Sequence, residues 1–160
     1  DCMTITQITL PTIVNLREAA TINHGYAAVI TAGPSRHEVN WGHNNHFVRT
    51  FDDTNSGPFK PTVKDMQAML EFAAKNEGDI LVHCHAGMSR STATAWGIAI
   101  QRGYNPFEAY DALLDKHPEG RMFWPNETLV AALERIFDIR GLGEYNHRHH
   151  YRGDFAPLYY

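Results

Sequence analysis

Cysteine is scarce in this chain: its two residues, Cys2 and Cys84, lie far apart in a sequence of 160 residues. Small secreted domains that depend on disulfides carry dense, even-numbered sets of cysteines, and this pattern is absent. No apolar run reaches the roughly 18 residues that a membrane-spanning helix needs. The opening residues, DCMTITQITL, show no basic region followed by an apolar run, as a signal peptide would. We therefore expect a cytoplasmic protein that does not associate with membranes.

Positive charge is also limited. The 14 Lys and Arg residues stand against 18 Asp and Glu, which gives a net charge of -4, and the basic residues form no run or stripe. This excludes the electrostatic surface typical of nucleic-acid-binding proteins. The ten histidines include His43, His46, His147, His149 and His150, but none has the spacing of a known metal-binding motif. We expect neither a metal nor a cofactor, and any anionic ligand must be held by local groups.

The remaining composition, 43% hydrophobic and 20% charged, is that of an ordinary globular protein. The length suits one domain, and the sequence contains no internal repeat or low-complexity tract. We assign residues 1–140 to a single domain. Residues 141–160 are assigned to a C-terminal tail, either docked or flexible. The sequence does not determine the oligomeric state, and we take a monomer as the default.

Strand and helix patterns alternate along the chain. The predicted strands are residues 5–10, 27–31, 46–51 and 79–82, the last of which is short, apolar and central. The predicted helices begin at Thr62, Ser89, Asn105 and Asn126 and end at Gly78, Gly103, before Pro118 and at Gly141. This order predicts an α/β fold with a central, mostly parallel sheet of about four or five strands flanked by helices.

The segment ILVHCHAGMSRS, residues 80–91, follows the central strand and leads into a helix. A short loop in this position can point successive backbone N–H groups at one anion, and the helix dipole adds positive potential. The predicted phosphate-binding loop consists of His85, Ala86, Gly87, Met88, Ser89 and Arg90. Gly87 allows its tight curvature, and Arg90 can donate two hydrogen bonds to a phosphoryl group.

Cys84 lies at the floor of this predicted loop. Donors that bind phosphate also stabilise a thiolate, which lowers the thiol pKa and makes the sulfur a candidate nucleophile. The Ser91 hydroxyl can reach the sulfur and make it a better leaving group. We expect His83 to order the loop backbone near Cys84, although a structural histidine in the core is an equal alternative.

At His83, Cys84, Arg90 and Ser91 the sequence resembles the protein tyrosine phosphatases, in their dual-specificity branch. The resemblance covers residues 46–140. It implies a dual-specificity phosphatase-like fold and hydrolysis of phosphate monoesters through a cysteinyl-phosphate intermediate. It also implies an aspartate on an upstream loop as general acid, for which Asp53 is favoured and Asp52 is the alternative.

The resemblance implies a protein substrate phosphorylated chiefly on tyrosine, with phosphoserine and phosphothreonine as further substrates, or a small phosphoester. Two other functions remain open: a catalytically weak module that binds phosphorylated ligands, and rhodanese-like sulfur transfer or arsenate reduction on the same loop. Asn126 is expected to cap a helix, with a supporting role near the site as a second possibility.

Overall fold

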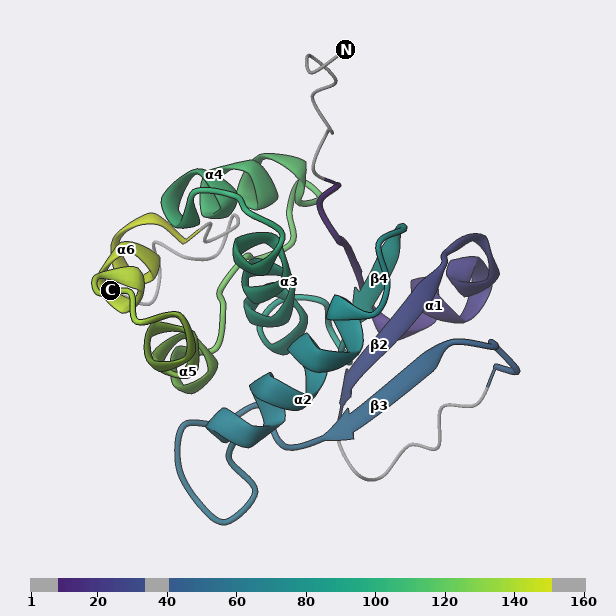
Figure 1. The fold of residues 1–160 in the computed structure, drawn as a ribbon, viewed down its shortest axis with the longest axis horizontal. Coiled ribbons are helices and arrows are strands. Elements are labelled where there is room, and N and C mark those ends of the chain that lie inside the picture. The colour runs from purple at the N-terminus through teal and green to yellow at the C-terminus, as the bar shows by residue number, and fades with distance from the viewer. Residues whose placement is uncertain (1–8, 34–40, 151–160) are drawn as a thin grey trace.

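The computed structural model describes residues 9–33 and 41–150, which form a parallel sheet between two helical layers (Figure 1). In spatial order the four strands of this sheet are β1 (Thr12–Val14), β4 (Ile80–His83), β2 (Ala28–Gly33) and β3 (His46–Thr50). Every neighbouring pair is parallel. The predicted α/β fold and the central position of the strand before Cys84 are confirmed.

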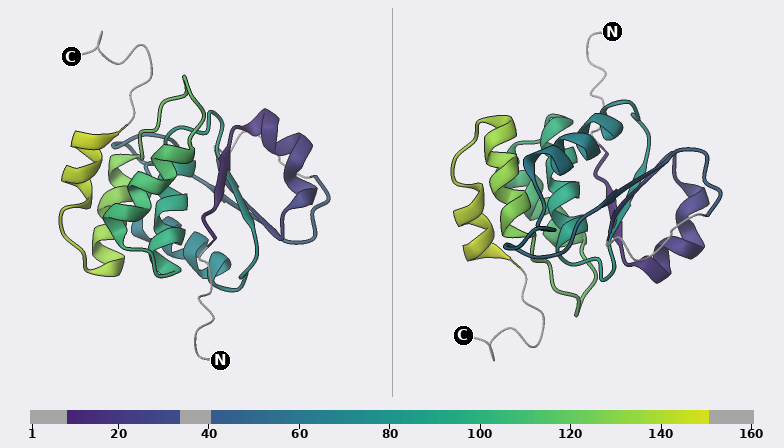
Figure 2. Two further views of the ribbon diagram at one scale, coloured as in Figure 1. Left: turned by 90° about the horizontal axis from the view of Figure 1, so that it is seen from above. Right: turned by 90° about the horizontal axis from the view of Figure 1, so that it is seen from below.

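Helices cover the two faces of the sheet unequally. Helix α1 (Leu16–Ile22) lies on one face, next to a short 3-10 turn at Asn23–Gly25. The other face carries α2 (Val63–Ala74), α3 (Arg90–Gln101), α4 (Pro106–Lys116), α5 (Glu127–Phe137) and α6 (Leu142–His149). Figure 2 shows this division in both views. The thicker layer therefore supplies most of the core.

Alternation along the strands sends side chains to both layers. Ile30 of β2 and Val82 of β4 join the large core beneath α2 and α3. Val29 and Leu81, one residue earlier on each strand, join a small cluster with Ala19 of α1. Both clusters are fully buried at these positions, which explains why the two inner strands read as continuous apolar runs.

Most predicted helix boundaries are confirmed by the caps. Thr62 and Asp65 form a reciprocal capping box at the start of α2, and the Asn105 side chain caps α4 ahead of Pro106. Two predicted ends are wrong. Helix α2 ends at Ala74, with Lys75 as its C-cap, before Gly78, whose added Cβ would lie 2.9 Å from Ala27.

The second wrong end concerns α5, which we expected to close at Gly141. Its C-cap is Asp138, a non-glycine residue in the left-handed conformation with φ 52°. Gly141, with φ 91°, instead begins α6. The prediction failed because aspartate tolerates this conformation better than most residues, so the helix ended three residues earlier than glycine indicated.

The N-terminal part of the prediction needs correction as well. Residues 5–8 of the predicted first strand lie outside the described residues, and residues 9 and 10 adopt no regular structure; the strand occupies Thr12–Val14. Helix α1 was not predicted. Its signal was present, since Asn15 and Glu18 form a second capping box, but seven residues give too short a periodic pattern to detect.

Helix α6 lies within the segment assigned to the C-terminal tail. Leu142 and Asn146 are buried, and Asn146 donates from its side chain to the Pro125 carbonyl. The Tyr110 hydroxyl of α4 donates to Asn146 Oδ1 over 2.9 Å. Residues 142–149 are therefore packed on α4 and α5, while residues 151–160 lie outside the described part of the chain.

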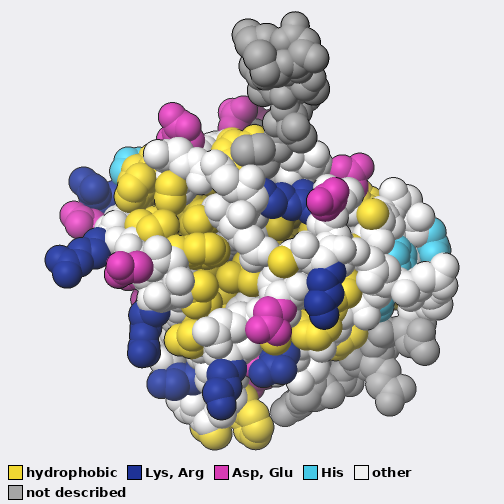
Figure 3. Space-filling model, viewed as in Figure 1, with side chains coloured by type: hydrophobic (Ala, Val, Ile, Leu, Met, Phe, Trp, Pro, Cys, Tyr) yellow, Lys and Arg dark blue, Asp and Glu magenta, His cyan; other side chains and the backbone are white. Residues whose placement is uncertain are grey.

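The surface of the helical layer mixes charges of both signs. Figure 3 shows Lys and Arg side chains interspersed with Asp and Glu on this face, and hydrophobic side chains gathered over α3 to α6. Within residues 9–33 and 41–150, no helix combines the length and the apolar character that crossing a membrane requires.

Removing the Tyr110 hydroxyl tests whether α6 is an integral part of the domain. We expect Tyr110→Phe to lower the free energy of unfolding by about 1–3 kcal/mol, because Asn146 Oδ1 loses its donor in a buried position. Tyr145→Phe is the matched control: its hydroxyl bonds Asp111 at the surface, so the loss should stay within about 0.5 kcal/mol. If urea unfolding showed equal losses of unfolding free energy in the two variants, the buried hydrogen bond between Tyr110 and Asn146 would not be holding α6 to the domain.

Candidate active site

The candidate site lies at the carboxyl ends of the parallel strands, where ligands of open α/β sheets bind. The turn of residues 84–89 follows β4. The loop of residues 51–62, predicted to carry the general acid and called the acid loop below, follows β3. The segment after β1 passes beside the turn. The Leu16 amide donates to the His85 carbonyl over 3.2 Å, and the Arg90 side chain reaches Phe51 at the start of the acid loop. Three strand ends therefore converge on one turn.

Gly87 sets the curvature of the turn. Its φ is 71°, in the left-handed region, and a Cβ built on it would lie 2.9 Å from the carbonyl carbon and oxygen of Val14 and 3.0 Å from the amide nitrogen of Asn15. Glycine is therefore required twice, for its conformation and for the close approach of the β1 backbone.

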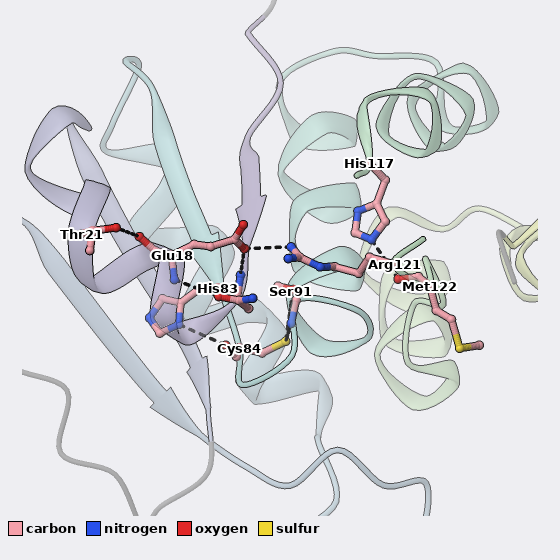
Figure 4. A network of polar contacts seen from close by, with 10 residues as sticks. Glu18, Thr21, His83, Cys84, Ser91, His117, Arg121 and Met122 are labelled. Atoms are coloured by element: carbon pink, nitrogen blue, oxygen red, sulfur yellow. Dashed lines mark hydrogen bonds and ion pairs between the residues drawn. The ribbon is translucent and has the colours of Figure 1, made fainter. Parts of the chain in front are cut away.

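The Cys84 sulfur lies at the floor of the turn, as a free thiol that is 3% exposed. The Gly87 amide donates to it over 3.2 Å, and Ser91 Oγ, from the first turn of α3, lies 3.2 Å away (Figure 4). Either the hydroxyl or the thiol can be the donor of the contact between Ser91 and Cys84. The structure thus places Gly87 and Ser91, both singled out by the sequence, against the sulfur.

Arg90 is buried against the base of the acid loop. One terminal nitrogen donates to the Phe51 carbonyl over 3.0 Å, while Nε is buried without a hydrogen-bond partner in the described structure. A buried unpaired guanidinium nitrogen costs free energy unless a ligand binds it. The N-cap residue of α3, Ser89, makes no side-chain cap, so the helix N-terminus keeps its positive end open to an anion.

Asp53 is tied directly to the turn. Its Oδ1 accepts from Ser89 Oγ over 2.7 Å and from Asn126 Nδ2 over 3.0 Å. Oδ2 receives no hydrogen bond from any described residue. Asp52 differs, because its backbone bonds Phe59 and Thr54 while its exposed carboxylate has no described partner. The carboxylate of Asp53, and not that of Asp52, is therefore hydrogen-bonded to the turn.

Asn126 combines both positions that the sequence left open. Its Oδ1 accepts from the Leu129 amide and caps α5, while its Nδ2 donates to Asp53 and to the Thr54 carbonyl. Its own amide donates to the Ser89 carbonyl over 3.2 Å. One asparagine thus connects the helix, the acid loop and the turn.

His83 is buried directly before the turn. Its Nδ1 lies 3.3 Å from the Cys84 carbonyl oxygen, and its Nε2 lies 2.6 Å from the Thr31 hydroxyl. Burial lowers the pKa of His83 to about 4, against the opposing effect of the Cys84 carbonyl. The ring is therefore neutral near neutral pH. Thr31 was missed by the sequence analysis, because a threonine in a buried strand carries no signal of its own.

An ion pair crosses the rim of the site. Arg121 binds Glu18 Oε1 over 2.9 Å, joining the loop before α5 to α1 (Figure 4). The hydrogen bond from Arg121, followed by that from the Asn15 amide, lowers the pKa of Glu18 below its usual value. The part of the chain that the structure describes holds no group of three His, Cys, Asp or Glu side chains arranged for a metal ion.

No family model matches the sequence, and no curated protein is significantly similar to it. Solved structures are similar in fold. Human DUSP28 superposes with a TM-score of 0.61 at 17% identity, covering 84% of this chain and 96% of its own. DUSP15 gives a TM-score of 0.61 at 18% identity over 89% of this chain and 94% of its own. PTPMT1 gives 0.55 at 20% identity, with 87% and 92% covered.

This chain has the dual-specificity phosphatase fold. The fold implied by the resemblance at residues 83–91 is therefore confirmed by its overall shape, independently of that motif. At this level of identity the comparison concerns architecture alone. The geometry described above, and not the comparison, is the basis for the roles proposed below for Cys84, Arg90 and Asp53.

Substitution of Gly87 tests whether the β1 backbone shapes the turn. Gly120→Ala is the control, since φ there is 79° but no atom lies within 4 Å of the added Cβ. We expect the control to cost about 1–2 kcal/mol from conformation alone. Gly87→Ala should cost a further 1–3 kcal/mol or so, because Val14 and Asn15 obstruct the methyl group. Urea unfolding measures both, and equal costs would show that the contact with β1 is unimportant.

Proposed function

We propose that this chain is a cysteine-dependent phosphatase that hydrolyses phosphate monoesters through a cysteinyl-phosphate intermediate. The main support is the unpaired, buried Nε of Arg90, six residues after a sulfur that already accepts from Gly87 within the same turn. A tetrahedral oxyanion above the sulfur would satisfy this nitrogen and the open N-terminus of α3. The phosphatase folds found by comparison agree with this chemistry.

In the first step the Cys84 thiolate attacks phosphorus and the bond to the leaving oxygen breaks. Asp53 gives a proton to that oxygen. Arg90 and the amides of the turn offset the repulsion between an anionic nucleophile and an anionic ester, and follow the equatorial oxygens into the transition state. Because the donors are fixed by the turn, no reorganisation is needed as the charge moves.

In the second step water attacks phosphorus and the P–S bond breaks. The Asp53 carboxylate takes a proton from the water, which restores its acid form. The electron pair of the broken bond returns to the Cys84 sulfur as a thiolate, which Ser91 Oγ stabilises from 3.2 Å. Inorganic phosphate leaves, and the enzyme regains its starting protonation state.

The cavity beside the turn favours phosphotyrosine in proteins as the substrate. Its volume is about 280 Å³, and its lining includes Met88 and Ser89 of the turn together with Asp53. Its apolar lining is formed by Met88, Met122, Trp124 and Pro125. An aryl leaving group packs well on methionine and tryptophan side chains, whereas phosphoserine offers no comparable surface.

A phosphoinositide is the principal non-protein alternative, since the PTPMT1 structure is a complex with PI(5)P. In this chain the cavity also carries the Asp53 and Glu127 carboxylates, and the turn contains no lysine. These charges oppose a polyanionic headgroup. Comparing kcat/KM for a phosphotyrosine peptide, a phosphoserine peptide and PI(5)P vesicles separates the substrate classes.

Replacement of the nucleophile tests the reaction itself. We expect wild-type protein to hydrolyse an aryl phosphate in the presence of EDTA, and Cys84→Ser to show only background hydrolysis, because a neutral hydroxyl is a weak nucleophile here. Full activity in Cys84→Ser would overturn the proposal. Tight binding of tungstate or phosphopeptide without turnover by wild type would instead identify a binding module.

The two aspartates provide a matched pair for the general acid. We expect Asp53→Ala to reduce kcat by about 10²-fold or more, since the leaving oxygen loses its proton donor. Asp52→Ala should leave kcat within a few-fold of wild type, because its carboxylate contacts no described residue of the turn. The reverse pattern in steady-state kinetics would assign the proton to Asp52.

A further inference from the structure

A series of hydrogen-bonded side chains leads from β3, the edge strand of the sheet, to the backbone of Cys84. His46 Nε2 lies 2.6 Å from Thr31 Oγ1, and the same oxygen lies 2.6 Å from His83 Nε2. His83 Nδ1 in turn contacts the Cys84 carbonyl. These side chains come from β3, β2 and β4, all on the face of the sheet that carries α1. None of these hydrogen bonds is made by a group that the proposed mechanism uses to bind phosphate.

Hydrogen-bond chemistry fixes the direction of this series. The Cys84 carbonyl can only accept, so His83 Nδ1 must carry the proton. A neutral imidazole has a single N–H, and burial keeps His83 neutral. Its Nε2 is therefore an acceptor, and the Thr31 hydroxyl must donate to it.

The same reasoning extends one step outward. The Thr31 hydroxyl has one hydrogen, which is committed to His83, so its oxygen must accept from His46 Nε2–H. His46 can donate this hydrogen bond both as the neutral Nε2–H form and as the cation. The assignment therefore runs outward from the Cys84 carbonyl: His83 carries its proton on Nδ1, and His46 carries one on Nε2.

Trp41 covers these side chains from the solvent side. Its ring stacks on His46 with centroids 5.5 Å apart and an interplanar angle of 1°, and it meets His83 at 5.1 Å. Thr31 and His83 are 3% and 1% exposed. Since water hardly reaches the Thr31 and His83 side chains, a ring nitrogen of His83 that lost its hydrogen-bond partner would remain unsolvated, at a cost in free energy.

We infer that Thr31 and His46 are positioning residues that lock His83 in the Nδ1–H tautomer and thereby hold the Cys84 backbone, and with it the sulfur, at the floor of the turn. The inference relies on the proposed function only in treating Cys84 as the nucleophile. The tautomer itself can be observed without substrate or turnover.

The decisive measurement uses the full chain with ¹⁵N-labelled histidine rings. The His83 signals are identified through their contacts with Thr31 and Trp41 protons, and we expect the two-bond ¹H–¹⁵N pattern of an Nδ1–H ring. An Nε2–H ring in the wild-type protein would overturn the inference without any variant.

Two pairs of variants then test the outer residues. Thr31→Val removes the hydroxyl and Thr31→Ser keeps it; His46→Phe keeps a ring against Trp41 but removes the N–H, and His46→Gln restores a donor. We expect Thr31→Val and His46→Phe to lose the single His83 tautomer. They should also slow iodoacetamide alkylation of Cys84 at pH 6 by about fivefold, the size of one ordinary hydrogen bond.

Thr31→Ser and His46→Gln should behave as wild type in both measurements, with alkylation followed on the Cys84 peptide by mass spectrometry so that Cys2 does not contribute. Unchanged tautomer and alkylation in Thr31→Val and His46→Phe would reject the positioning role. A wild-type protein that shows the expected tautomer and alkylation but no phosphate hydrolysis would refute the proposed function while leaving this inference intact.

Discussion

The contact between Gly87 and the backbone of β1 is the constraint on which the site depends. With no room for a Cβ, the turn after β4 lies directly against Val14 and Asn15, and this contact curls the chain until the Gly87 amide faces the Cys84 sulfur. The parallel pairing of β1 with β4 places the two backbones side by side at this edge. The geometry of the turn therefore depends on how β1 pairs with β4.

Two polar side chains, those of Arg90 and Ser89, join the turn to the neighbouring loop. Arg90 binds the base of the acid loop through Phe51 while its Nε stays available to a ligand. Ser89 uses its hydroxyl on Asp53 and leaves the helix N-terminus uncapped. Because the loop that carries Asp53 and the turn after β4 share these contacts, a shift in one segment is transmitted to the other.

On the opposite face of the sheet, a second set of contacts supports the same cysteine from below. Thr31 and His46 lie on β2 and β3, not on the strand that leads into the turn, yet their hydrogen bonds end at the Cys84 carbonyl through His83. The thin layer formed by α1 and Trp41 is sufficient here, since it needs only to keep water from a short polar chain. The thick helical layer supplies the stability of the fold.

Local sequence patterns predicted much of the structure. The strand 80–83, the caps at Thr62, Asn105 and Asn126, and the turn with its Cys, Gly and Arg all follow from short-range rules that any neighbouring residues obey. The errors occurred where such rules were weak or competed. Helix α1 is too short for periodicity, and Asp138 took the left-handed cap that glycine usually occupies.

The sequence alone determined the chemical groups of the candidate site, because the sulfur, the Gly87 amide and the guanidinium lie within seven consecutive residues, 84–90. Tertiary structure decided everything that depends on distant segments meeting. It distinguished Asp53 from Asp52 through contacts with Ser89 and Asn126, which lie 36 and 73 residues away. It also joined His46 and Thr31 to His83. Sequence patterns report periodicity and local hydrogen bonding, whereas these partners are chosen by strand order and loop packing, which no local pattern contains.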